Sequence, residues 1–289
     1  MSTPRLVGDK RAAKLNGSDD MLKRFFYPIL ASLLLVSCGG AKEKFTVTVG
    51  DVSFDMVRVK AGTFTMGCTA EQAAFPQGDW EIEGRYDRAA FERVHEVTIS
   101  KDFFIGETEV TQALYEAVMG ENPSGFSNGG SYPVETVSFN DAMEFCRRLS
   151  EMTGRTFTLP TEAQWEYAAR DGHKAPAEPT VFAGSANLDE VGWYMGNAEE
   201  TTHEVATLKP NALGLYDMTG NVWEWCRDWW NDDFGSDPVT DPEGPSEGTK
   251  HVDRGGSWNK VASHCRLSFR YGLDPEYKAY NLGFRVVCE

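Results

Sequence analysis

Apolar and polar residues alternate along four short stretches in the first half of the chain, and this pattern predicts β-strands. A side-chain period of two is typical of strands that bury one face. Ala61 and Gly62 separate the first two stretches, which predicts a hairpin between them. The predicted strands are 54–59, 63–66, 95–99 and 103–105.

Three later stretches repeat apolar residues every three or four positions, which predicts helices at 111–119, 141–152 and 161–170. Ser138 with Asp141, and Thr161 with Gln164, have the spacing of capping boxes at the second and third helix starts. The buried stripe of the second helix is expected to hold Met143, Cys146, Leu149 and Met152.

The remaining sequence predicts irregular structure. Residues 40–48 are expected to form a tether, and the polar stretch 68–93 a long loop. Beyond Gly172 regular periodicity fades, so long ordered loops are expected, and loops of that length need something to hold them. Short strands, helices and loops together predict the α+β class. No linker divides the chain, so 51–289 is expected to be one domain.

The N-terminal part has the residue pattern of an export signal. The apolar run 25–36 follows Lys23 and Arg24, and it is too short for an ordinary membrane span. It ends in Leu-Val-Ser before Cys38, the pattern of a lipobox, which predicts a signal peptide over 21–37 and a lipidated tether over 38–50. Residues 1–20 are expected to be a disordered lead or a misassigned start. The alternative is a plain secretory signal in which Cys38 is incidental.

These features predict a lipoprotein of the bacterial cell envelope, held at the membrane by its lipid anchor. The chain has 28 basic and 44 acidic residues, a net charge of −16, and such a surface repels a phosphate backbone. Nucleic acid is therefore not expected as a partner. Six cysteines in an exported protein indicate disulfides.

The stretch 211–230, NALGLYDMTGNVWEWCRDWW, has the most distinctive composition in the chain. Within it the carboxylates of Asp217 and Glu224 and the backbone carbonyls of Gly220 and Val222 stand close together in sequence. Hard oxygen donors at a glycine-bearing turn suit a calcium ion. The alternative is a solvated turn whose acids cap local amides.

Three further motifs of distinctive composition are LPTEAQWEYAAR (159–170), DRGGSW (253–258) and NLGFRV (281–286). In this order the four motifs resemble the formylglycine-generating enzyme family, the sulfatase-modifying-factor domain, over roughly 54–288. The resemblance implies an irregular C-type-lectin-like fold and calcium at 217–224. It also implies a second calcium site at Asn187, the Leu188 carbonyl, Asn197 and the Glu199 carbonyl, although the asparagines could equally be turn formers.

Enzymes of this family hold copper(I) between two cysteines, and the resemblance places these positions at Lys260 and Cys265. A protonated lysine is no ligand for a soft ion, so copper and formylglycine chemistry are not expected. Ser257 matches a serine near the family's active centre, and it remains a candidate catalytic residue together with Cys265. His264 could reach a metal or act as a base, although a satisfied or solvent-facing histidine is the commoner case.

The resemblance also suggests how cysteines and arginines are used. Cys146 matches a family cysteine bonded to the terminal strand, and Cys288 lies two residues beyond the family partner's position, hence on the same strand face. A Cys146–Cys288 disulfide is therefore predicted, and Cys226 could pair with Cys265. Buried ion pairs with Glu162, Glu166 or Glu224 are expected for Arg254, Arg266, Arg270 and Arg285, the alternative being an anionic or peptide ligand.

The sequence thus favours a calcium-stabilised binding or scaffold module with a cleft near Ser257, Trp258, Lys260 and His264, and with a protein or peptide as partner. One alternative is an active oxidase of sulfatase-type cysteines that acts through Cys265. Another is a component of a cell-envelope secretion assembly.

Overall fold

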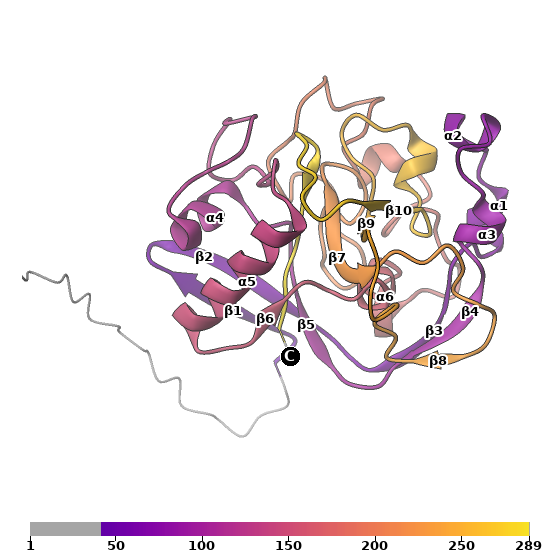
Figure 1. The fold of residues 1–289 in the computed structure, drawn as a ribbon, viewed down its shortest axis with the longest axis horizontal. Helices are drawn as coiled ribbons and strands as arrows, with labels where there is room; N and C mark the ends of the chain where they lie inside the picture. The colour runs from indigo at the N-terminus through magenta and orange to yellow at the C-terminus, as the bar shows by residue number, and fades with distance from the viewer. Residues whose placement is uncertain (1–41, 289) are drawn as a thin grey trace, which may run out of the picture. The chain divides into compact units, whose positions relative to one another are not determined.

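A computed structural model describes residues 42–288 of the chain (Figure 1). The predicted signal peptide and the lipidation site Cys38 lie outside these residues. Helices and strands are both present in separate groups, which confirms the α+β class. Within 42–288 no helix is both long and apolar enough to span a membrane.

The largest sheet has five strands and is antiparallel throughout. Its order is β1 (Lys44–Val49), β2 (Val52–Val59), β5 (Phe103–Gly106), β12 (Val287–Cys288) and β6 (Phe157–Thr158). The last strand of the chain therefore lies inside the sheet, between β5 and β6. From Lys44 onward the expected tether is wrong, because β1 pairs along its whole length with β2.

A three-stranded sheet contains β3 (Gly62–Met66), β4 (His95–Ile99) and β8 (Val239–Thr240). The predicted hairpin between β2 and β3 is wrong, since β3 pairs with β4 while β2 pairs with β1 and β5. The chain changes sheet at Ala61, whose amide donates to Asp102. Gly62 then passes so close to the Tyr167 hydroxyl that a Cβ would lie 2.2 Å from it.

The third sheet lies in the part of the chain where only loops are expected. Its order is β10 (Arg270–Leu273), β9 (His251–Arg254), β7 (Trp223–Trp229) and β11 (Leu282–Gly283). Both faces of β7 are mostly buried, so its sequence lacks the alternation that marks a half-exposed strand. A register shift between Trp225 and Trp229 interrupts its pairing with β9.

The three predicted helices are confirmed as α4 (Gln112–Met119), α5 (Phe139–Thr153) and α6 (Glu162–Ala169). Both capping boxes form at the expected residues, because the side chain and the backbone amide exchange hydrogen bonds at each start. The buried face of α5 is rotated from the expected stripe. It holds Phe139, Ala142, Phe145, Cys146 and Leu149, whereas Met152 is 50% exposed.

The stretch 68–93, expected to be a loop, contains three short helices: α1 (Ala70–Ala74), α2 (Asp79–Ile82) and α3 (Arg88–Phe91). Figure 1 shows them at the edge of the domain away from α4 and α5. Three 3-10 helices complete the elements: η1 (Gly172–Lys174), η2 (Leu188–Glu190) and η3 (Ala262–Cys265).

Two large hydrophobic clusters hold these elements in place. One joins α4 and α5 to β1, β2 and the tryptophans of β7. The other joins α6 to β3, β4 and β5. A smaller cluster around Phe182, Leu188, Val191 and Cys265 lies beneath the irregular segments. The motif-bearing segments are thus fixed from several sides, and this positions the site described next.

Candidate functional site

The predicted calcium turn lies beside a buried ion pair. Glu224, on β7, accepts two hydrogen bonds from the Arg285 guanidinium at 2.6 Å each, and one from the Trp165 indole N–H at 2.7 Å. Asp217 has a positive φ of 55°, and its Oδ2 accepts from the Ala206 amide at 2.8 Å. The Asp217 Oδ1 atom is buried and has no hydrogen-bond partner.

A third carboxylate, Glu109, joins this turn from the loop between β5 and α4. It accepts from the Val222 amide at 3.0 Å and from the Asn221 amide side chain at 2.8 Å. Burial and the charges of Asp217 and Glu224 raise the pKa of Glu109 well above its usual range. Burial likewise raises the pKa of Asp217 to about 6. Three buried carboxyls share one arginine, so they are not all ionised together unless a further cation balances their charge.

This arrangement fits a calcium ion. The unpartnered Asp217 oxygen and the nearby acid are what a hard divalent cation would neutralise. Gly220 fixes the turn, with φ at 84° and with no room for a Cβ beside the Trp193 carbonyl. No trio of His, Cys, Asp or Glu side chains within 42–288 is itself arranged as a metal site, so backbone carbonyls such as those of Gly220 and Val222 would have to contribute. Calcium at this turn stays a prediction.

Glu109 is the member of this cluster that is not predicted from the sequence. It lies more than a hundred residues before Asp217 and outside the four motifs. It is the third residue after the strand β5, and a single acid in such a loop has many other uses.

The second predicted calcium site fits poorly. Asn187 Oδ1 accepts from the Asp189 amide at 3.3 Å, and Asn197 Oδ1 from the Tyr194 amide at 2.8 Å. The Leu188 carbonyl accepts from the Gly192 amide at 2.9 Å, and Glu199 has a φ of 51°. These oxygens take part in local hydrogen bonds, and calcium at these four residues stays a prediction.

The two positions of the family's copper site differ in character. Cys265 is buried, and burial raises the pKa of its thiol to about 12, although Lys260 acts in the opposite direction. Without a metal the thiol is therefore protonated near neutral pH, and Lys260 supplies no second thiol beside it. The Lys260 ammonium lies 5.0 Å from the centre of the Trp80 ring. Ser257 Oγ donates to Asn259 at 3.0 Å and accepts from Asn281 at 3.0 Å, so its hydroxyl is engaged in the loop.

His264 is buried between aromatic rings. Its ring centre lies 4.3 Å from that of Trp80 and 4.6 Å from that of Phe269. Burial lowers the pKa of His264 to about 4, so the imidazole is neutral at physiological pH. Neither ring nitrogen has a hydrogen bond, and the closest acid is Asp79, whose Oδ1 is 3.4 Å from Nε2. Asp79 belongs to the stretch 68–93, in which no partner for His264 is predicted from the sequence.

Within residues 42–288 no disulfide is formed, and Cys226 and Cys265 lie in different hydrophobic clusters. Cys146 and Cys288 are buried in the same cluster. Ser150 Oγ links the backbone near the two cysteines. It donates to the Cys146 carbonyl and accepts from the amide of Phe157, the residue on β6 that pairs with Cys288. The bridge is absent from this structure, and a disulfide in the oxidised protein stays a prediction.

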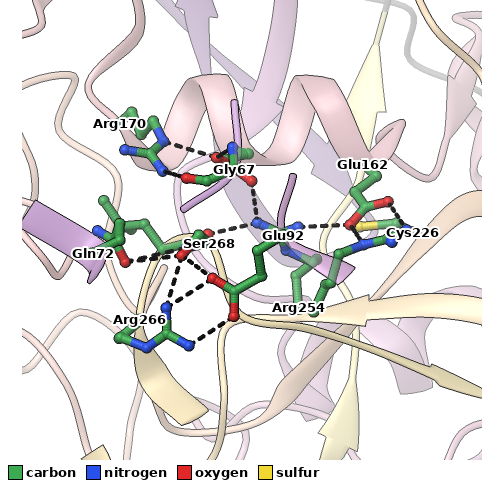
Figure 2. A network of polar contacts seen from close by, with 12 residues as sticks. Gly67, Gln72, Glu92, Glu162, Arg170, Cys226, Arg254, Arg266 and Ser268 are labelled. Carbon is green, nitrogen blue, oxygen red and sulfur yellow. Dashed lines mark hydrogen bonds and ion pairs between the residues drawn. The ribbon is translucent and has the colours of Figure 1, made fainter. Parts of the chain in front are cut away.

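The expected ion pairs of the buried arginines are confirmed for three of the four. Arg254 donates to Glu162 and Glu166 at 2.6 and 2.5 Å, Arg270 donates to Glu162, and Arg285 to Glu224. Figure 2 shows Arg254 in this network, together with Arg266, whose partner is Glu92 at 2.7 and 2.8 Å. Glu92 comes from the stretch 68–93 and is not among the predicted partners. All four guanidiniums are occupied inside the protein and leave none for an external anion.

Comparison with known proteins places this architecture in a family. The family model of the sulfatase-modifying factor enzyme 1-like domain matches residues 48–289. The chain therefore belongs to this family, that of the formylglycine-generating enzymes, and the resemblance inferred from the four motifs is confirmed.

Individual relatives have different names. The chain is 34% identical to the chaperone protein LppX of Paenibacillus barcinonensis, over 66% of this chain and 81% of that protein. It is 30% identical to the mouse formylglycine-generating enzyme, over 81% of this chain and 75% of the enzyme. Among solved structures, Treponema denticola variable protein 1 is similar, with a TM-score of 0.73 and 32% identity over 86% of this chain and 99% of that one.

Proposed function

We propose that this protein is an envelope lipoprotein whose domain is a calcium-stabilised binding module and not a copper oxidase. The observation that carries the proposal is the pair at the copper positions. Lys260 supplies an ammonium where the family has its other cysteine, so Cys265 is a single thiol at this place. The family's copper(I) site uses two thiolates, and the two described positions offer only one.

A surface of partly exposed and exposed aromatic and apolar side chains next to this position supports a binding role. We call it the aromatic patch, and it comprises Phe126, Met195, Trp258 and Tyr280. Met195 is 59% and Tyr280 62% exposed. The Trp258 indole N–H donates to the Tyr280 carbonyl at 3.0 Å, and its ring meets Phe126 edge to face. The Met195 amide donates to the Lys260 carbonyl.

Large side chains with few rotatable bonds are typical anchors of protein interfaces, because little conformational entropy is lost when they bind. The partner we propose is accordingly a protein or peptide. The name of the Paenibacillus relative, a chaperone protein, is compatible with a role in protein binding.

The test is oxidation of a sulfatase-type cysteine peptide by copper-loaded protein under oxygen, with mass spectrometry for the aldehyde. We expect no aldehyde from the native sequence. Lys260→Cys is the matched control, because it restores the second thiol at the family's position. Catalytic turnover by the native protein would overturn the proposal, whereas turnover by Lys260→Cys alone would show that only the metal site is missing.

A further inference from the structure

The indole of Trp80, on α2, is packed against the segment that follows the DRGGSW motif. Its ring centre lies 4.3 Å from that of His264 and 5.1 Å from that of Tyr271. The Lys260 ammonium lies 5.0 Å from the indole centre, a cation–π distance. We call this surface of Lys260, His264 and Tyr271 the Trp80 site.

The two neighbours of Trp80 are acids: Asp79 lies beside the neutral His264 imidazole and its charge acts on the Lys260 ammonium, and Glu81 faces a guanidinium. Asp79 Oδ1 is 3.4 Å from His264 Nε2, and Glu81 Oε1 is 3.6 Å from the Arg266 guanidinium. An acid–aromatic–acid tripeptide of the chain therefore lies against a surface of basic and aromatic groups. This is charge complementarity of the kind found between two partners in an interface.

The contact between residues 78–81 and the Trp80 site leaves polar atoms without hydrogen bonds. Both ring nitrogens of His264 and the hydroxyl of Ser263 are buried and have no hydrogen-bond partner. Gly78 lies directly over Ser263, where a Cβ would be 2.0 Å from the Oγ. Buried polar atoms without partners cost free energy, so residues 78–81 are held here less strongly than a fully hydrogen-bonded contact would hold them.

Side-chain contacts, and not pairing in a sheet, hold residues 78–86 against the Trp80 site. The backbone amides of residues 82–86 donate to carbonyls of residues 78–81, within the segment itself. Glu81 also accepts from the Gly78 amide at 2.6 Å and pairs with Arg88 of α3. Its release from the Trp80 site would break no strand pairing, but it would remove Trp80 from the hydrophobic cluster against which the indole packs.

We propose that Asp79-Trp80-Glu81 is an intramolecular ligand of the Trp80 site, and that an acidic peptide with a central aromatic residue binds there by displacing it. This rests on the proposed function, because it assigns a peptide class to the binding module and places the site next to the aromatic patch through Lys260. The chain's own segment shows which side chains the site accepts.

The probe is a fluorescent peptide with the sequence of residues 76–86, PQGDWEIEGRY, and its binding to the full chain is followed by anisotropy. Trp80→Ala should bind it about tenfold more tightly than the native protein, the factor expected if the native site is open in about a tenth of the molecules. Trp229→Ala is the matched control and should keep the native affinity. Adding Lys260→Gln to Trp80→Ala should weaken binding, as should replacing the peptide's tryptophan with alanine.

Equal affinity of folded Trp80→Ala and native protein, or no binding to either, would overturn the inference. If Trp80→Ala does not fold, hydrogen exchange of the native protein at saturating peptide decides. Faster exchange of residues 78–86 supports displacement, and unchanged exchange contradicts it. Copper-dependent turnover by the native protein would sink the proposed function alone, since peptide displacement is measured without copper.

Discussion

Replacing Arg285 with methionine should be among the most destabilising changes in the domain. Arg285 is fully buried and makes two 2.6 Å hydrogen bonds to Glu224, and it also donates to the carbonyls of Gly106 and Tyr216. Removing one member of a buried ion pair typically costs about 3–5 kcal/mol, because the other charge stays buried. Here the remaining Glu224 would also face Glu109 and Asp217, so we expect the upper end of that range.

Urea denaturation followed by circular dichroism measures this cost as a shift of the midpoint at constant slope. The matched control is Arg147→Met on the exposed side of α5, where the pairs with Glu144 and Glu151 are solvent-exposed and should contribute less than about 1 kcal/mol. The double variant Arg285→Met, Glu224→Gln should recover part of the loss. A cost below about 1 kcal/mol for Arg285→Met would refute the account of the buried cluster.

Three further predictions concern calcium, pH and the membrane. Chelation of calcium should lower the melting temperature, by the equivalent of roughly 2.7 kcal/mol at a calcium concentration about a hundredfold above Kd, and Glu109→Gln should weaken this response; a melting temperature indifferent to chelator would count against calcium. Burial raises the pKa of Asp228 to about 7 in the folded protein. The free energy of unfolding should therefore fall as pH rises from about 4 to about 7, because the unfolded chain loses this proton first. In Asp228→Asn the unfolding midpoint should depend less on pH over that interval. Cys38→Ala should move the protein from the membrane fraction to the soluble fraction, and unchanged partitioning would contradict lipidation.

Local signals in this sequence predict local structure well. The capping boxes at Ser138 and Thr161 place the starts of α5 and α6 correctly, because the hydrogen bonds concerned join residues three positions apart. The partners of Arg254, Arg270 and Arg285 are also foreseeable, since acids and arginines both lie in recognisable motifs.

Pairing between distant segments is where prediction from the sequence fails. The change of sheet at Ala61 depends on contacts with Asp102 and Tyr167, which no turn signal encodes. Glu109 at the calcium turn, Glu92 at Arg266 and Trp80 at His264 all come from outside the four motifs. In sequence each looks like an ordinary surface or loop residue. Their role depends on the folded stretch 68–93 and on the loop after β5, and both are fixed only by tertiary contacts.

Metal analysis of the purified native protein by mass spectrometry tests the central claim most directly. We expect calcium in stoichiometric amount with the protein and no bound copper, even after incubation with copper(I) and removal of the excess. Stoichiometric copper retained by the native sequence would contradict the proposed function, because a single thiol at Cys265 beside the Lys260 ammonium would then hold the metal.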